Sequence, residues 1–157
     1  MNPQHDDLLQ GLARRGCRVE TADAGALVSL PDNPDYPEPG DEFIFEQMGE
    51  WLYIGTTLMT PEEFEHSAHV ASLDRFLLIL QHRNLGCHFS YDAAGYLTIG
   101  TVLFPEQQRV DSVMQTMEHI GFVIDVCLPF LDHALESGDI AADDEVDQAF
   151  GINDRLH

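Results

Sequence analysis

The fold is decided by residues 75–110, which read RFLLILQHRNLGCHFSYDAAGYLTIGTVLFPEQQRV. The first residues of this stretch are apolar on nearly every side, which is typical of the end of a helix that is covered all round. Residues 87–91 then alternate between apolar and polar, as in a strand. Residues 92–95 (DAAG) predict a tight turn with glycine where positive φ is needed, and residues 97–103 predict the returning strand. The stretch therefore predicts a helix, a hairpin and the start of a second helix.

The residues before position 43 predict a short helix capped at Asp6 or Asp7, two extended pieces at 18–20 and 26–30, and a loop at 31–40. Four prolines fall within that loop, which forbids a helix or a central strand there. The short helix carries three leucines on one side: Leu8, Leu9 and Leu12.

Residues 43–59 predict a second hairpin. If Met48 and Gly49 form a two-residue loop, Phe45 lies opposite Leu52 and Phe43 opposite Ile54. One face then holds Phe43, Phe45, Leu52, Ile54 and Leu58, and the other holds Ile44, Trp51, Tyr53 and Met59. A one-residue slip in register would exchange these sets. Both faces are apolar, which is more than a sheet covered on one side needs.

Two long helices complete the expected fold. The sequence TPEE at 60–63 predicts a capped start for a helix that runs to about Arg83. The last helix begins between residues 106 and 111, and Pro129 should kink or end it. The element order is α-β-β-β-α-β-β-α, which indicates an α+β fold with an antiparallel sheet. Residues 1–137 form one domain, and residues 138–157 are expected to be an acidic, poorly ordered tail.

Charge limits the classes of partner. Twenty-eight acids oppose seven bases, all arginine, for a formal net charge of −21. Such a field repels nucleic acid and anionic membranes and favours basic partners. No apolar run reaches membrane-spanning length and the N-terminus lacks a signal-peptide layout, so we expect a cytoplasmic protein. The three cysteines show no paired motif, which favours reduced thiols.

No catalytic constellation stands out. His66 and His69 lie beside several glutamates, a set that could hold a metal, but a helical metal site needs matching ligands from other helices and no second such motif occurs. Cys87 and His88 are neighbours on a strand and face opposite ways. Phosphate-binding loops and nucleophile-elbow motifs are missing from the sequence. We therefore expect no metal, no cofactor and no enzymatic activity.

Apolar surfaces carry more information than polar motifs. The first helix, the Trp51 and Tyr53 face, the run 76–80 and a second stripe on the last helix together exceed what one small core needs. Surplus apolar faces on a strongly acidic chain indicate association with protein.

In element order and in residues 77–135, the chain resembles the small acidic chaperones of bacterial type III secretion, the class that includes the Tir chaperone family. The run LLILQHRNLGCHFSYDAAGYLTIGTVLFP, followed by VDSVMQTMEHIGFVIDVCLPFLDHAL, is similar to that family's helix, hairpin and closing helix. The acidic, lysine-free composition is similar to that of the general export-control chaperones of plant-pathogen systems, the HpaB type. The loop 31–40 and the acidic tail depart from the family pattern.

The resemblance implies a cytoplasmic homodimer that acts in virulence without ATP. It would bind the N-terminal region of secreted effectors in extended form and deliver them to the secretion ATPase. The residues expected to line the effector groove are Leu8, Leu9, Leu12, Ile44, Trp51 and Tyr53. Those expected at the two-fold interface are Phe76, Ile79, Phe122, Val126 and Phe130.

Three alternatives stay open at this point. A YbjN-type regulator resembles the same helix–hairpin–helix unit. An acidic immunity or inhibitor protein would cap a basic toxin through charge, and strong salt dependence of binding would favour it. A metalloenzyme built on His66 and His69 is the alternative with catalytic activity.

Overall fold

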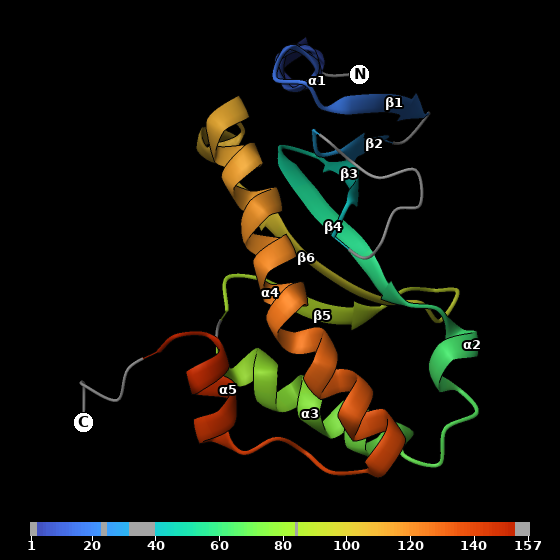
Figure 1. The fold of residues 1–157 in the computed structure, drawn as a ribbon. Helices are drawn as coiled ribbons and strands as arrows, with labels where there is room; N and C mark the ends of the chain where they lie inside the picture. The colour runs from blue at the N-terminus through green and yellow to red at the C-terminus, as the bar shows by residue number, and fades with distance from the viewer. Residues whose placement is uncertain (1–2, 23–24, 32–39, 84, 153–157) are drawn as a thin grey trace.

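The computed structural model describes residues 3–22, 25–31, 40–83 and 85–152. Its strands are β1 (Arg18–Ala22), β2 (Gly25–Ser29), β3 (Glu42–Met48), β4 (Trp51–Met59), β5 (His88–Tyr91) and β6 (Leu97–Leu103). Its helices are α1 (Pro3–Arg14), α2 (Pro61–Phe64), α3 (Val70–His82), α4 (Val110–Ser137) and α5 (Asp143–Ala149), with a short 3-10 turn η1 (Pro105–Gln107). The strands form one antiparallel sheet in the order β1-β2-β3-β4-β6-β5 (Figure 1).

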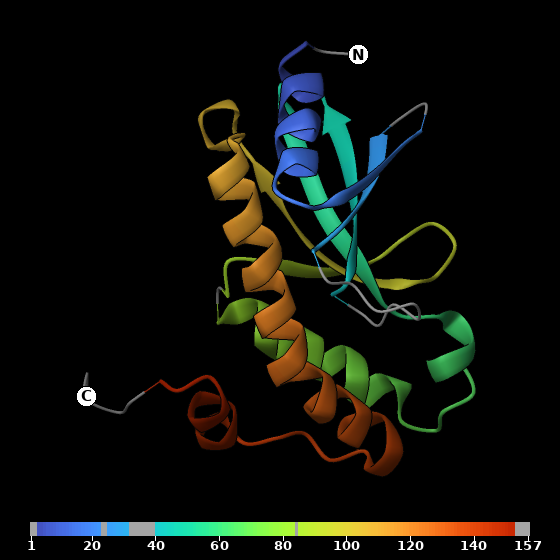
Figure 2. The same ribbon diagram turned by 45° about the horizontal axis from the view of Figure 1, so that its top comes forward.

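The helices α1, α3 and α4 lie on one side of the sheet (Figures 1 and 2). The inward side chains of the central strands are buried there; among them Phe43, Phe45, Leu52 and Ile54 are fully buried. The predicted α+β fold with an antiparallel sheet is confirmed. One detail of the order was wrong, because four strands rather than three precede the second helix: residues 18–22 and 25–29 are separate paired strands.

The register of the β3–β4 hairpin differs from the predicted one by two residues. Met48 pairs with Trp51, so the loop is Gly49-Glu50, and Phe45 lies opposite Ile54. A shift of two keeps every side chain on its predicted face. Met59 is the exception: it is buried, because a register shift between Thr57 and Met59 breaks the alternation at the end of β4.

The predicted helix from residue 60 to 83 is interrupted. It starts as expected, with the Thr60 N–H donating to Glu63 Oε2 at 2.6 Å, but α2 ends at Phe64 and α3 begins at Val70. Ser67 stabilises the break, since its hydroxyl donates to the Leu135 carbonyl at 2.7 Å and accepts the His69 N–H at 3.1 Å. Serine hydroxyls that bond nearby backbone compete with helical hydrogen bonds in this way.

The β5–β6 hairpin forms as predicted. Asp92 Oδ1 accepts hydrogen bonds from the N–H groups of Ala94 and Tyr96, both at 2.9 Å, and Gly95 takes φ +87°. An aspartate that closes its own turn and a glycine in the left-handed region are what this turn requires. The strand β6 extends beyond β5, because the pairing of the two strands covers only residues 97–100 of β6.

The helix α4 runs through Pro129 without ending and closes at Gly138, whose φ is +80°. Its inner stripe is buried against the sheet and α3, as its helical spacing predicted. Within the described ranges, none of the helices combines the length and the apolar character needed to cross a membrane.

The C-terminal segment was predicted as a poorly ordered tail, and this was wrong for residues 138–152. These residues contain α5, whose Val146 is only 1% exposed, and Phe150 packs at the edge of the core. An apolar pair four residues apart explains the docking, since it forms one face of a helix even among many acids. Positions 153–157, like 32–39 of the proline-rich loop and position 84, lie outside the described residues.

Candidate functional site

The face of the sheet that the helices leave uncovered carries a row of large apolar side chains. We call it the open sheet face and define it by the outward residues of four strands and the residue after β6: Leu27, Ile44, Glu46, Met48, Trp51, Tyr53, Val102 and Phe104. The pairings Leu27–Ile44, Glu46–Tyr53, Met48–Trp51 and Tyr53–Val102 place these residues side by side.

Four members of this face stay half-exposed although they are apolar. Ile44, Trp51 and Phe104 are each 48% exposed and Met48 is 44% exposed. The rings of Trp51 and Phe104 meet edge to face with centroids 5.5 Å apart. Water-exposed apolar groups gathered on one surface are unfavourable in a lone domain and typical of a binding surface.

Tyr53 forms the floor at the centre of this face. A side chain at Gly55 or Gly100 would overlap the Tyr53 ring, so the ring lies across these two paired glycines. Burial raises the pKa of Tyr53, while a hydrogen bond with Thr98 opposes that shift. The paired glycines thus allow an aromatic ring to lie flat on the sheet, and they leave a smooth central surface.

A hollow of about 340 Å³ lies at one end of the open sheet face. Leu27, Ile44 and Glu46 line it together with backbone near Gly25. A side chain at Gly25 would collide with the Phe45 carbonyl, so glycine lets β2 approach β3 closely here. The hollow is thus an apolar recess with one carboxylate at its rim.

The predicted groove residues divide into two groups. The structure brings Ile44, Trp51 and Tyr53 together on the open sheet face. Leu8, Leu9 and Leu12 are 4%, 5% and 0% exposed and belong to the core beneath α1, so they offer no surface to a ligand in this structure. Sequence reasoning missed Met48 and Phe104; the spacing of Met48 from Ile44 along one strand face was the available signal.

The predicted interface residues also divide. Phe76 is fully buried and its ring packs against Phe130 with centroids 6.3 Å apart, so it serves the core of the chain. Phe122 is 48% exposed and contacts the ring of Phe150 at 5.9 Å. Leu78 on α3 is 69% exposed, and the sequence did not single it out. Ile79, Val126 and Phe130 are partly exposed.

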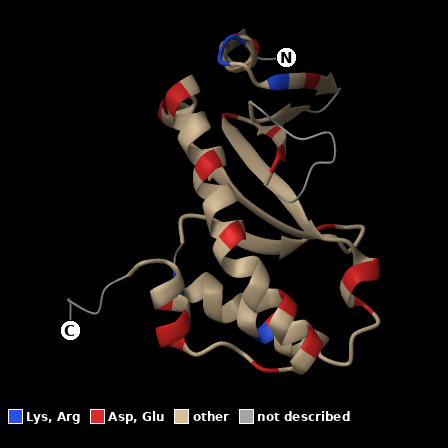
Figure 3. Cartoon of the chain, viewed as in Figure 1, with Lys and Arg blue, Asp and Glu red and all other residues tan. Residues whose placement is uncertain are grey.

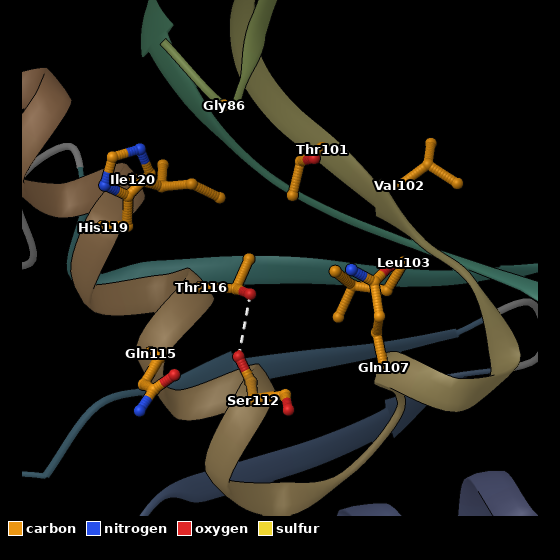
Figure 4. Close-up of a pocket in the computed structure, with 10 residues that line it drawn as sticks. All are labelled: Gly86, Thr101, Val102, Leu103, Gln107, Ser112, Gln115, Thr116, His119 and Ile120. Carbon is orange, nitrogen blue, oxygen red and sulfur yellow. Dashed lines mark hydrogen bonds between the residues drawn. The ribbon is translucent and has the colours of Figure 1, made fainter.

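A second, polar hollow of about 410 Å³ lies between the end of β6 and the first half of α4 (Figure 4). In it Thr116 Oγ1 donates to the Ser112 carbonyl at 2.8 Å, and His119 Nε2 lies 2.6 Å from the Leu85 carbonyl. Both contacts tie side chains to backbone, which is a structural use of these groups. The hollow presents hydroxyls and amides, and the described residues that line it include no carboxylate or thiol.

The thiols and the histidine pair do not add a reactive centre. Burial raises the pKa of Cys87 to about 11 and that of Cys127 to about 12, so both are protonated at neutral pH. His66 is exposed and lies 3.5 Å from Glu65. In the part of the chain that the structure describes, no group of three or more His, Cys, Asp or Glu side chains is arranged to hold a metal ion.

Comparison with known proteins gives a fold but no family. No family model and no curated protein sequence matches the chain. A chain in the crystal structure of the ExsC–ExsE complex aligns with a TM-score of 0.51 and 12% identity, covering 83% of this chain and 97% of that one. A chain in the heterodimeric ExoU–SpcU complex, from the type III secretion system of Pseudomonas aeruginosa, aligns with a TM-score of 0.55 and 17% identity, covering 83% and 98%. At these identities the likeness concerns the fold alone.

Proposed function

We propose that the chain is a type III secretion chaperone that binds the N-terminal region of effector proteins in extended form on its open sheet face. It acts in the cytoplasm as a homodimer and passes its cargo to the secretion ATPase. The observation that carries this proposal is the row of half-exposed apolar side chains on a fold shared with chains of partner-protein complexes, one of them from a type III secretion system.

The geometry of the open sheet face favours an extended ligand. Ile44 and the Met48–Trp51 pair lie four residues apart along β3, a separation of about 13 Å at roughly 3.3 Å per residue. A ligand in extended form spans that distance with residues i and i+4, whose side chains project to the same side. Its residue i+2 then lies over Tyr53 and Glu46, where an arginine or lysine would meet both a ring and a carboxylate.

The charge of the chain supports the same choice of ligand. A formal charge of −21 attracts basic segments and speeds their encounter more than it adds affinity. Among the residues that the structure describes, Asp and Glu are distributed over several elements, including α2, α4 and α5 (Figure 3). This distribution favours binding by apolar contacts with general attraction over capture of a basic toxin by a single acidic surface.

The proposed homodimer uses exposed apolar groups away from the open sheet face. Leu78 and Phe122, on α3 and α4, are the large apolar side chains of those two helices that are exposed. Segment binding and dimerisation therefore rest on separate surfaces, and each should be removable without the other.

Two matched charge insertions test this separation. Ile44→Asp should reduce the affinity for an extended segment with apolar residues at i and i+4 and arginine at i+2 by about thirtyfold, since loss of one of its two apolar anchors costs about 2 kcal/mol. Leu78→Asp should leave that affinity unchanged and yield monomers.

Fluorescence anisotropy measures the affinity for the segment, and light scattering measures the oligomeric state. A segment whose second apolar residue is moved to i+3 is the ligand control. Equal loss of segment binding in both variants would refute the assignment of the surfaces. Binding abolished by moderate salt in the wild type, with Ile44→Asp unaffected, would favour an inhibitor of a basic protein.

A further inference from the structure

The C-terminal residues 138–152, which we call the strap, are attached to α3 and α4 by both charge and apolar contact. Arg83 Nη2 donates to Asp143 Oδ1 at 2.8 Å and to the Asp143 carbonyl at 3.2 Å, while Nη1 bonds Asp147. The Arg83 side chain is 16% exposed, so these pairs are partly shielded from water. Val146 is buried and Phe150 covers part of Phe122.

Beside the strap lies a surface of opposite character on α3, which we call the α3 stripe: Arg75, Leu78, Ile79, His82 and Arg83. The spacing i, i+3, i+4, i+7, i+8 puts these side chains on one face of the helix. They line a hollow of about 440 Å³ whose remaining wall is Asp143 of the strap. The stripe thus combines aliphatic and cationic side chains in a chain with few cations.

Electrostatics makes the α3 stripe the natural meeting place for two copies. Two chains that each carry a formal charge of −21 repel each other, and the electrostatic free energy of association is least unfavourable where cations and apolar groups coincide. When the strap is docked it removes part of this advantage, because Asp143 and Asp147 neutralise Arg83 and Asp143 forms part of the wall of the hollow. Both carboxylates contact Arg83, so a partner seated on the stripe would meet them at short range, where salt screens charge only weakly.

We propose that the strap is a releasable cover that competes with a second copy of this chain for Arg83, at the edge of the α3 stripe, and for Phe122. This proposal rests on the homodimer of the proposed function and adds a means by which the chain regulates its own dimerisation. Gly138, at φ +80° and against the ring of His69, fixes where the strap leaves α4. Both chains of a dimer must have the strap open, so the apparent affinity for a second copy falls with the square of the open fraction, and a strap open about one time in three weakens dimerisation about tenfold.

Variants of the strap in the full chain test this without altering the α3 stripe. Asp143→Asn/Asp147→Asn removes both pairs to Arg83, and Val146→Asn removes the apolar contact without changing charge. The matched control is Asp144→Asn/Glu145→Gln, which makes the same charge change at exposed side chains of the same helix. Hydrogen exchange of amides 143–150 reports release of the strap, and sedimentation equilibrium reports the dimer dissociation constant.

Release should lower the dissociation constant about tenfold in Asp143→Asn/Asp147→Asn and in Val146→Asn, and by less than about twofold in the control. Adding Leu78→Asp to a released variant should return it to monomer. Faster hydrogen exchange of the strap without tighter dimerisation would overturn the proposal. If dimerisation became weaker when the strap is released, the strap would be part of the dimer interface. Monomers in every variant would overturn it together with the homodimer, while segment binding on the open sheet face is measured separately and stands or falls alone.

Discussion

Replacing Trp51 by alanine is the sharpest single test of the open sheet face. The side chain is 48% exposed and its main described ring contact is Phe104, so its removal opens no enclosed cavity. Burying a large aromatic fully is worth about 3–5 kcal/mol on truncation, so for a half-exposed ring we expect a loss of stability of about 1–2 kcal/mol. The chain should remain folded at room temperature.

The effect on binding should be larger than the effect on folding. A ligand that covers Trp51 buries its exposed half, and loss of a central aromatic anchor costs about 2 kcal/mol or more, roughly thirtyfold in affinity. Isothermal titration with an effector's N-terminal segment measures this. Tyr96→Ala is the control, because Tyr96 is a 38% exposed aromatic in the β5–β6 turn, away from the open sheet face. Equal affinities for the two variants would refute the reasoning.

Two further predictions concern the fold that supports the surface. Gly100→Ala should lower the free energy of unfolding by about 1–3 kcal/mol, because a side chain there meets the Tyr53 hydroxyl and the Ile54 carbonyl. Gly121→Ala in α4 is the matched control, since a side chain has room there and the substitution should be neutral or stabilising by up to about 1 kcal/mol. Urea unfolding measures both free energies. His5 is buried, its Nδ1 has no hydrogen-bond partner among the described residues, and burial lowers its pKa from the ordinary 6.5. As pH falls, the unfolded chain therefore takes up a proton on His5 before the folded chain does. The free energy of unfolding should drop as pH falls below about 6.5, and it should drop less in His5→Leu. Equal slopes of the free energy of unfolding against pH in the two proteins, between about pH 7 and 5, would contradict this.

The elements best predicted from sequence are those whose pattern is local. The hairpin of β5 and β6 follows from its turn residues and alternation, and the inner stripe of α4 follows from helical spacing over many turns. The two faces of the β3–β4 hairpin were also predicted, even though its loop was placed one residue early. Faces depend only on the parity of the register, whereas the loop depends on turn geometry.

What the sequence did not reveal depends on contacts between distant segments. The break at Ser67 requires the Leu135 carbonyl, which lies 68 residues away along the chain. The position of Tyr53 over Gly55 and Gly100 requires the pairing of β4 with β6. An amphipathic helix such as α1 shows from its sequence that it has an apolar side, but not whether the core or a ligand covers that side. The leucines of α1 were therefore assigned to a groove, and the structure places them in the core.

The docking of the strap could not be predicted from its sequence for the same reason: it depends on contacts with distant segments. Its acids predict solvation, and two apolar residues among them are a weak signal. Docking becomes visible only when Arg83 and Phe122 are brought together in space by the packing of α3 on α4.

The emission of Trp51, the only tryptophan in the chain, tests the central claim most directly. The wild-type protein is titrated with an effector's N-terminal segment that lacks tryptophan, and emission wavelength and acrylamide quenching are recorded. If the segment binds on the open sheet face, the emission should shift to shorter wavelength and quenching should fall, both saturating with the binding isotherm measured by anisotropy. Binding that leaves the emission and quenching of Trp51 unchanged would contradict the account.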